Sequence, residues 1–554
     1  MRQSLAPKSL INVLTSKKFL LTVTMITAAA MLLGTAWISD DAFISLRVID
    51  NFVNGWGLRF NIIERVQVFT HPLWLFLLTF FYFFTREAPI TTMLVSVLLS
   101  LCALWLLGTK IAHNQQRGCL LILAAIASLS IMSFLTSGLE TPLTFFLLGI
   151  FVWQLYRPGK VWVAALVAGL LFLNRLDLTV LLGPIIVYLI FQERGINLIK
   201  IVLAALLPVL LWTVFSLIYY GAIFPNTAYA KLGTGIDTTL LMAQGFQYAL
   251  YFIQADSLLA LVIGYAIFDS LASRDALTKM LGLGIILYIV YIIIIGGDFM
   301  LGRFFSVPGF LALCLLARSP ALQSLNEKNN AWIFFAAIIY CWLSLMDRTV
   351  HHDYWATNRH GIADERVAYY DQNGLLPILE ELLSTGHEPH HVDRDEGKVW
   401  KAQSQASLKN IVILTNNPGM QGYYAGPAVH LVDVLALTDA FLARLPTPSN
   451  PPPRVGHYGR LVPYGYCETI LNTNPTTDIE SLRPLLNDVT LVTRAPLFQP
   501  KRWDAIWRLF FEKKYYNFEN FKDGIIEDGF YEYYDALPVI IGSNDGARRV
   551  KFTQ

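Results

Sequence analysis

Two adjacent acids, Asp40 and Asp41, follow almost directly on an apolar run at residues 19–38. Neighbouring carboxylates repel one another, so one of the pair can hold its proton to a higher pH than an isolated acid does. A carboxylate of that kind suits a general base, which accepts a proton from a reacting hydroxyl. The pair is therefore a candidate for acid–base chemistry, although two adjacent acids also occur as ordinary solvated loop residues.

Further acids lie beside later apolar runs. Glu140, Asp177 and Asp298 could orient sugar hydroxyls, bind a metal ion or pair with a neighbouring cation, or they could simply be acids at helix ends. Asp298 is the more specific signal because Gly296 and Gly297 precede it, and glycine permits a close backbone approach. These three acids are candidate substrate-binding residues.

Four cations lie near the ends of the same apolar runs: His71, Arg175, Lys231 and Arg303. Phosphate binding needs positive charge and several hydrogen-bond donors, which these side chains supply. Each one alone could be structural. As a set, they predict a site for the phosphate of a lipid-linked substrate.

No metal or cofactor motif accompanies these residues. Histidines occur in the stretches 351–360 and 387–391, but neither stretch has a zinc-protease spacing such as HExxH. We therefore predict no required cofactor and no metal site, although Glu140 and Asp298 could hold a divalent cation.

Composition places these residues in a membrane protein. The 554 residues are 55% hydrophobic and 15% charged, with a mean hydropathy of +0.48, whereas soluble domains carry about 25% charged residues. The net charge of +2 gives no reason to expect a nucleic-acid partner. The run at 19–38 is too long for a cleavable signal peptide and is typical of a signal anchor.

Charge asymmetry indicates how often the chain crosses the bilayer. Twelve apolar runs lie between residues 19 and 346. The run at 72–85 has only 14 residues, roughly 21 Å of helix, which is short for a bilayer core of about 30 Å. If this run lies in the interface, eleven crossings remain and the basic gaps collect on the cytoplasmic side. All the candidate site residues then face the opposite side.

The chain is predicted to have two parts. Residues 1–346 form a multi-pass helical membrane domain, with the acids in an outer loop at 39–89. Residues 347–554 form a soluble α/β domain outside the cytoplasmic membrane. In that domain, β-like runs at 411–415, 429–434 and 489–492 predict strands, and the patch at 374–383 predicts a helix.

The amino-acid sequences of several segments resemble those of one branch of the GT-C class of membrane glycosyltransferases, the AftB family of arabinofuranosyltransferases. The segments that carry the resemblance are Asp40 to Ile44, Glu64 to Val66, Thr70 to Trp74, Gly138 to Thr141, Pro225 to Lys231, Gly297 to Phe304, Val432 to Asp439, Arg444 to Pro446, and Gly456-His457.

The resemblance implies a GT-C-like fold and transfer of arabinofuranose from a polyprenyl-phosphate donor to a hydroxyl of an extracytoplasmic glycan or glycoprotein. It implies Asp40 as the base, with Asp41 as second choice. Arg303 and Lys231, helped by His71 or Arg175, would hold the phosphate, and Tyr229 would line the lipid or sugar path.

Two alternatives stay open. The first is a GT-C transferase for another lipid-linked sugar, such as mannose or aminoarabinose, because motifs at the outer face do not identify the sugar. The second is a transporter or flippase for lipid-linked glycans. A transporter would show inverted repeats and charges at mid-membrane depth, and the sequence has no such repeat and only Asp269 within a span.

Overall fold

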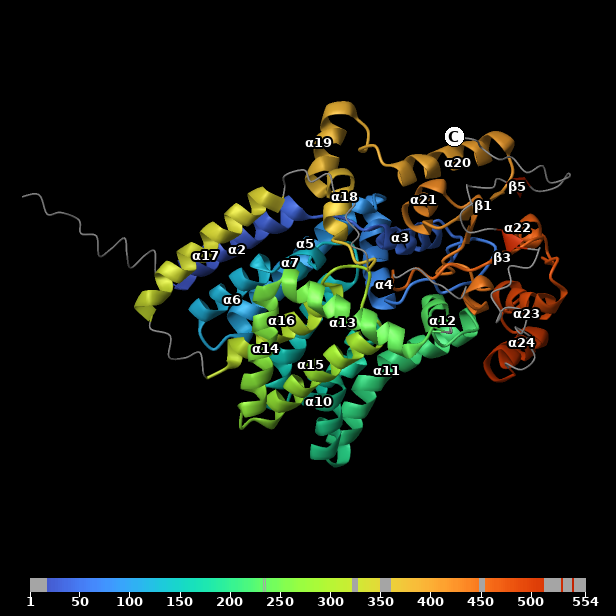
Figure 1. Ribbon diagram of the computed structural model, residues 1–554. Coiled ribbons are helices and arrows are strands. Elements are labelled where there is room, and N and C mark those ends of the chain that lie inside the picture. The colour runs from blue at the N-terminus through green and yellow to red at the C-terminus, as the bar shows by residue number, and fades with distance from the viewer. Residues whose placement is uncertain are drawn as a thin grey trace, which may run out of the picture. The chain divides into compact units, whose positions relative to one another are not determined.

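The computed structural model describes residues 17–232, 234, 236–320, 327–348, 360–447, 454–512, 530–531 and 541–542 (Figure 1). The chain divides into two compact units. Unit 1 comprises Met1–Ser39, Pro89–Val209 and Leu241–Pro389, and unit 2 comprises Asp40–Ala88, Leu210–Leu240 and His390–Gln554. Each unit thus joins segments that are far apart in the sequence. The linear boundary at residues 346 and 347 stays a prediction.

The named elements of unit 1 among the described residues are helices, joined by loops and by two isolated β-bridges. Its elements are α2 (Lys17–Thr35), α5 (Pro89–Leu106), η1 (Leu107–Ile111), α6 (Gln115–Ala127), α7 (Leu129–Phe134), α8 (Thr141–Leu155), α9 (Val161–Asn174), α10 (Leu178–Gln192), α14 (Ser257–Ala272), α15 (Ala276–Ile294), α16 (Arg303–Arg318), α17 (Glu327–Arg348), α18 (Glu365–Asn373) and α19 (Leu375–Thr385). Two further helices, α11 (Gly195–Tyr219) and α13 (Thr238–Ala255), have residues in both units.

Apolar helices confirm the membrane character of the chain. Four described helices are long and apolar enough to cross a bilayer, namely Lys18–Thr35, Pro89–Ile111, Gly195–Tyr219 and Ala276–Ile294. Helices α13 and α14, bent by 108° at their junction, would be a fifth if the pair counts as one span. Other apolar helices have 10–17 residues. The count of eleven crossings therefore stays a prediction.

Residues 72–85 form the helix that the sequence predicts. Helix α4 (Pro72–Thr85) begins at a proline, which the first helical position tolerates because its missing N–H would have no partner there. The patch at 374–383 is also helical, as α19, and it belongs to unit 1. The interfacial position of α4 stays a prediction.

Unit 2 mixes helices and strands. Its elements are α3 (Asp40–Val53), α4, α12 (Asn226–Leu232), α20 (Val392–Ser407), β1 (Ile411–Thr415), α21 (Pro418–Ala425), β2 (Val429–Asp433), η3 (Leu442–Arg444), β3 (Val462–Pro463), α22 (Tyr466–Thr469), η4 (Glu480–Leu482), α23 (Arg483–Arg494), α24 (Pro500–Phe511), β4 (Phe530–Tyr531) and β5 (Ile541–Gly542).

A small sheet orders the centre of unit 2. Strands β1 and β2 are parallel, with Ile411 opposite Val429 and Thr415 opposite Asp433, and β5 pairs antiparallel with β1. Helix α21 connects the two parallel strands, because parallel neighbours need a crossover. The strands predicted at 411–415 and 429–434 are confirmed. The strand predicted at 489–492 is wrong: these residues lie in α23, whose apolar positions follow a helical rather than an alternating period.

Candidate active site

Unit 1 brings five of the predicted site residues together at helix ends. Glu140 and Asp177 directly precede α8 and α10, Arg175 follows α9, and Arg303 begins α16. Asp298 lies five residues before Arg303. The ion pairs among these side chains form one continuous cluster, which we call the ion-pair cluster.

Arg175 is the buried centre of the ion-pair cluster. Its Nη2 and Nε donate to the two carboxylate oxygens of Asp177 at 2.6 and 3.2 Å. Nη2 also donates to the Tyr288 hydroxyl at 3.0 Å, and Nε lies 3.6 Å from Glu140 Oε1. A bidentate pair in a buried setting is rigid as well as strong. The geometry therefore favours Arg175 as an organiser of the cluster.

Arg303 is held more loosely. Its Nη1 lies 3.4 Å from Asp298 Oδ2, and its Nη2 lies 3.7 Å from Glu140 Oε1. The side chain retains 16% exposure, against 4% for Arg175. Asp298 is itself oriented by the Phe299 N–H, which donates to its Oδ1 at 2.8 Å. Of the two arginines, Arg303 is thus the more exposed.

Several buried polar atoms beside this cluster have no hydrogen-bond partner among the described residues. They are Arg175 Nη1, Thr141 Oγ1 and Asn174 Oδ1. Buried polar atoms are costly unless they are hydrogen-bonded. Such atoms suit a ligand that carries several hydroxyl groups or phosphate oxygens.

Asp40 belongs to unit 2 and is the first residue of α3. Its Oδ1 accepts from the Met420 N–H at 2.7 Å, in the first turn of α21, where helix N–H groups favour negative charge. A Cβ added at Gly419 would lie 2.2 Å from Asp40 Oδ2, so only glycine permits this approach. The Asp40 side chain is thus held in one place and is mostly buried.

Arg47 fixes α3 against α21 and β2, and the sequence did not single it out. The guanidinium is buried and donates to the carbonyls of Phe60, Gly422 and Val429 at 2.8, 2.7 and 2.6 Å. Burial lowers the pKa of Arg47 to about 9, which still leaves the group charged at neutral pH. Because α3 carries Asp40, Arg47 positions the predicted base indirectly.

Asp41 and His71 lie around the same helix. Asp41 is only half-buried, so it is more accessible than Asp40. The ring of His71 is buried between Ser45 Oγ, 2.9 Å from Nε2, and Thr70 Oγ1, 3.2 Å from Nδ1. One ring nitrogen thus contacts a hydroxyl of α3, and the other contacts the hydroxyl of the preceding residue, Thr70. A role of His71 in phosphate binding stays a prediction.

Lys231 and Tyr229 lie on α12. Asn226, at the start of this helix, donates from Nδ2 to the carbonyls of Ala436, Leu437 and Asp439 at 2.9–3.1 Å, which fixes α12 in unit 2. Lys231 is exposed, and in the described part of the chain no carboxylate forms an ion pair with it. It is therefore the predicted phosphate-binding cation most available to a ligand.

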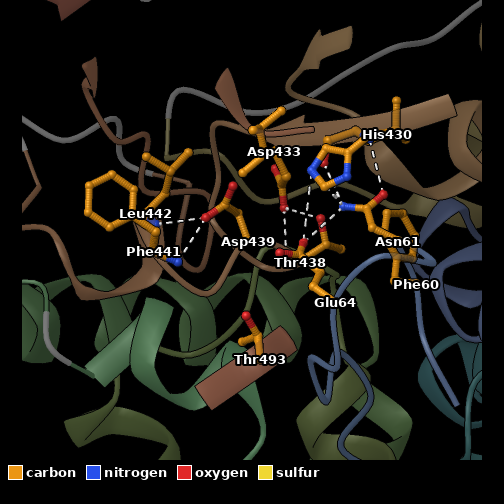
Figure 2. Close-up of polar contacts among 12 residues, drawn as sticks. Phe60, Asn61, Glu64, His430, Asp433, Thr438, Asp439, Phe441, Leu442 and Thr493 are labelled. Atoms are coloured by element: carbon orange, nitrogen blue, oxygen red, sulfur yellow. Dashed lines mark hydrogen bonds and ion pairs between the residues drawn. The ribbon is translucent and has the colours of Figure 1, made fainter. Parts of the chain in front are cut away.

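A buried group of acids in unit 2 was not assigned any chemistry from the sequence. Figure 2 shows Asp433 at the carboxyl end of β2, with Glu64, His430 and Asp439 around it. Asp433 accepts from the Leu435 and Thr438 N–H groups at 2.9 and 3.0 Å. Glu64, Asp433 and Asp439 lie in segments quoted above for the family resemblance, but the sequence analysis gave them no role.

Asp439 and Glu64 complete this buried acid group. Asp439 Oδ1 accepts from the Phe441 and Leu442 N–H groups at 2.9 and 2.8 Å (Figure 2), and its Oδ2 accepts from the Tyr466 hydroxyl at 2.9 Å. Glu64 Oε2 lies 3.8 Å from Arg494 Nη2. Backbone N–H groups therefore supply several of the hydrogen bonds to Asp433 and Asp439.

Burial shifts the pKa values of this group toward its neutral forms. It raises the pKa of Asp433 to about 6 and, together with the charge of Glu64, that of Asp439 to about 7. Burial also raises the pKa of Glu64 and lowers that of His430 well below its usual value. His430 is thus neutral at pH 7 and forms no ion pair with Glu64.

The raised pKa of Asp439 predicts an unusual pH dependence of stability. The folded state holds a proton that the unfolded chain, with an aspartate pKa of about 3.9, releases. This contribution is fully present below pH ~4 and is lost as the pH rises toward 7. Asp439→Asn cannot ionise, so it should unfold at a higher temperature than the wild type at pH 8 and at a similar temperature at pH 4.

The measurement is thermal unfolding in detergent at both pH values. Asp488 is the contrasting control, because its carboxylate accepts from Arg508 at 2.9 and 2.6 Å. Asp488→Asn should therefore lower the unfolding temperature at pH 8. A loss of stability at pH 8 in both variants would contradict a protonated Asp439.

The structure contributes little on metals. Among the described residues, no three His, Cys, Asp or Glu side chains are grouped so that they could hold a metal ion. Most of the histidine stretch at 351–360 lies outside the described residues. Metal independence stays a prediction.

Comparison with known proteins supplies relatives in sequence. No family model matches the chain. A protein of Mycobacterium tuberculosis named terminal beta-(1->2)-arabinofuranosyltransferase is 28% identical over 408 residues, covering 62% of this chain and 63% of the relative. A protein of the same name from Corynebacterium glutamicum is 27% identical over 390 residues, covering 60% and 55%. The match spans less than two thirds of either relative, and it confirms the resemblance to the AftB family.

Solved structures with some similarity include two membrane enzymes. ArnT from Cupriavidus metallidurans bound to undecaprenyl phosphate gives a TM-score of 0.44 at 14% identity, over 82% of this chain and 85% of that one. The Archaeoglobus fulgidus oligosaccharyltransferase gives 0.48 at 11% identity, over 85% and 66%. Scores below 0.5 do not establish a shared arrangement of residues.

Proposed function

We propose that this chain is a membrane glycosyltransferase that transfers arabinofuranose from a polyprenyl-phosphate donor to a hydroxyl of an extracytoplasmic glycan or glycoprotein. The observation that carries the proposal is the similarity to two proteins named terminal beta-(1->2)-arabinofuranosyltransferase over about 60% of the chain. The buried acids and arginines at helix ends support a polar reaction centre in a chain of apolar helices.

The mechanism requires two tasks. A base must deprotonate the attacking hydroxyl while positive groups stabilise the phosphate that leaves the sugar. Asp40 is the proposed base, with Asp41 as the alternative. Its hydrogen bond to Met420 stabilises the ionised form that a base must have before reaction.

Phosphate stabilisation falls to the more available cations. Arg303 is more exposed than Arg175, and Lys231 is exposed, so both are accessible to a phosphate. Glu140 and Asp298 orient Arg303. Oxygen and nitrogen atoms without partners near Arg175 supply further contacts for the sugar or the phosphate.

The remaining predicted residues have supporting roles. Asp177 anchors Arg175 through a bidentate pair. Tyr229 lines the lipid or sugar path beside Arg444, whose guanidinium lies 4.8 Å from its ring centre. His71 contributes mainly by holding α3 next to α4. No cofactor is required, because a monophosphate leaving group can be stabilised by side chains alone.

Loss of either proposed phosphate-binding cation should weaken donor binding. A charge-assisted contact to phosphate contributes about 1.5–3 kcal/mol, so Arg303→Ala and Lys231→Ala should each raise the donor Michaelis constant roughly 10- to 100-fold. The acceptor constant should change less. The measurement is steady-state kinetics with each substrate varied in turn, and Lys401→Ala, at another exposed lysine of unit 2, is the control. An unchanged donor constant in both variants would remove these residues from the phosphate site.

The proposed architecture is GT-C-like, with about eleven crossings of the cytoplasmic membrane and with α4 in the interface. The Asp40 loop and the C-terminal region then share the outer side. Single cysteines at Asn54 and Gln405, both exposed, test this arrangement in a background without the native cysteines. A membrane-impermeant maleimide should label both positions in intact cells. Labelling of only one position would exclude the shared side.

The function itself is tested with the purified protein. Synthetic polyprenyl-phosphoryl arabinofuranose and a glycan acceptor should yield a product heavier by one pentose, and surface glycans of cells without this protein should lack that pentose. Transfer from a mannose or aminoarabinose donor instead would identify a different sugar. Movement of the lipid-linked sugar across the membrane without transfer would show that the chain is a transporter and not an enzyme.

A further inference from the structure

We propose that α24 docks on the lipid bilayer through an aromatic face formed by Trp503, Trp507, Phe510 and Phe511. This inference is independent of the reaction that the chain catalyses. It follows from the pattern of the helix and from the place where the helix is attached.

Helix α24 has three distinct sides. One side is buried and carries Arg502, Ala505 and Ile506. A second side carries the four residues of the aromatic face. Trp507 and Phe511 are 59% and 68% exposed, whereas Trp503 and Phe510 are half-buried and also pack against the cluster of Ile506 and its neighbours. A third side carries the polar residues Lys501, Asp504 and Arg508. Because each residue turns the helix by about 100°, Lys501 lies roughly 120° from Trp507.

The buried side attaches α24 to the end of α11, a candidate membrane span. Arg502 Nη2 donates to the carbonyl of Tyr219, the last residue of α11, at 3.2 Å. Leu217 packs against the cluster of Ile506 and its neighbours. A Cβ added at Gly221 would lie 3.1 Å from Ile506, so the chain leaving α11 passes close to α24. Within unit 2, α24 is therefore fixed to this end of the span.

That end of α11 has the signature of a membrane–water boundary. Trp212, Phe215 and Tyr219 form consecutive ring contacts at 5.1 and 5.3 Å. Aromatic side chains concentrate at the ends of membrane spans because their rings suit the headgroup region. Along the same helix, Leu210 and Leu211 are 54% and 63% exposed, as expected for a surface that faces lipid.

The lipid surface is the occupant that fits the aromatic face. Contiguous exposed aromatic groups mark an interaction surface rather than a solvated one. An amphipathic helix with tryptophan and phenylalanine on one side and charges on another lies in the plane of the interface. Phe498, 75% exposed just before α24, extends the apolar surface. Attachment beside an aromatic boundary holds α24 at the depth where such a helix binds.

Photo-crosslinking in a bilayer tests the proposal. The full-length protein carries p-benzoylphenylalanine at position 507 in place of Trp507, in nanodiscs of phosphatidylethanolamine and phosphatidylglycerol. The matched control carries it at position 501, on the polar side of the same helix. We expect a several-fold excess of lipid adducts on the peptide that covers residues 500–511 when the probe is at position 507. Equal lipid labelling at both positions would overturn the proposal.

Two further outcomes distinguish other occupants. Crosslinks from position 507 to residues 513–554 would show that another segment of the chain covers the aromatic face. Crosslinks to a second copy would show an interface between protomers. Either result, in place of lipid adducts, refutes bilayer docking. As a second readout, hydrogen exchange of α24 should be slower in nanodiscs than in amphipol without detergent micelles. Equal exchange rates in the two samples would count against bilayer docking.

Discussion

Asp40→Asn should lower the turnover number by roughly 10²–10⁴ while donor binding and folding persist. Asparagine keeps the size of the side chain and can still accept from the Met420 N–H at 2.7 Å, but it cannot take a proton from the attacking hydroxyl. Asparagine fits the same space beside Gly419, and one of its atoms remains an acceptor for the Met420 N–H. The assay is sugar transfer in detergent, with donor binding measured separately.

The neighbouring acid supplies the control. Asp41→Asn should reduce turnover less, because the half-buried Asp41 would act mainly through its charge on Asp40. Wild-type turnover in Asp40→Asn combined with inactivity in Asp41→Asn would reverse the two roles. Full activity in both variants would make the loop structural and move the search for the base to Glu140, Asp177 or Asp298.

Arg175→Met should lower the free energy of unfolding by about 3–5 kcal/mol. The substitution removes the cation that holds Asp177 at 2.6 Å and lies 3.6 Å from Glu140, so Asp177 loses its cation and Glu140 keeps Arg303 but loses Arg175. Methionine fills a similar volume, so the loss reports charge rather than a cavity. The measurement is equilibrium unfolding in mixed detergent micelles.

Paired variants separate this electrostatic effect from other causes. Arg175→Met combined with Asp177→Asn should recover part of the loss, because the uncompensated carboxylate is then gone. Arg175→Lys should keep the charge but lose the bidentate geometry, with an intermediate stability. Stability equal to the wild type in Arg175→Met would show that the buried pair is not required for the fold. Arg175 would then again be a candidate for phosphate binding.

The two buried arginines thus differ in what they organise. Arg175 stabilises the helix ends of the ion-pair cluster in unit 1, whereas Arg47 ties α3 to carbonyls of α21 and β2 in unit 2. Neither is the most accessible cation of its unit. The proposed phosphate contacts are Arg303 and Lys231, so the kinetic predictions concern those residues and the stability prediction concerns Arg175.

The sequence by itself determined the class of the protein and the helical segments. Apolar runs of helical length can bury their backbone polar groups only as helices, so composition alone predicts membrane helices. It also predicted α4 to the residue, and the strands at Ile411–Thr415 and Val429–Asp433. In these cases the local pattern and the final environment favour the same structure. At 489–492 the two differ: a short run of β-favouring residues lies inside a longer amphipathic helix, and packing overrides the local propensity.

Only the tertiary structure decided which charges are paired and which remain available. Sequence spacing placed Arg175, Arg303, Lys231 and His71 in one set of cations. Burial and partners separate them, because a side chain's partners come from segments that are distant along the chain, as Arg303 and Glu140 are. For the same reason, the sequence could not predict the raised pKa values of Asp433 and Asp439, which arise mainly from burial in the folded chain. Charge and residue type are local properties, whereas desolvation and pairing exist only once the chain has folded.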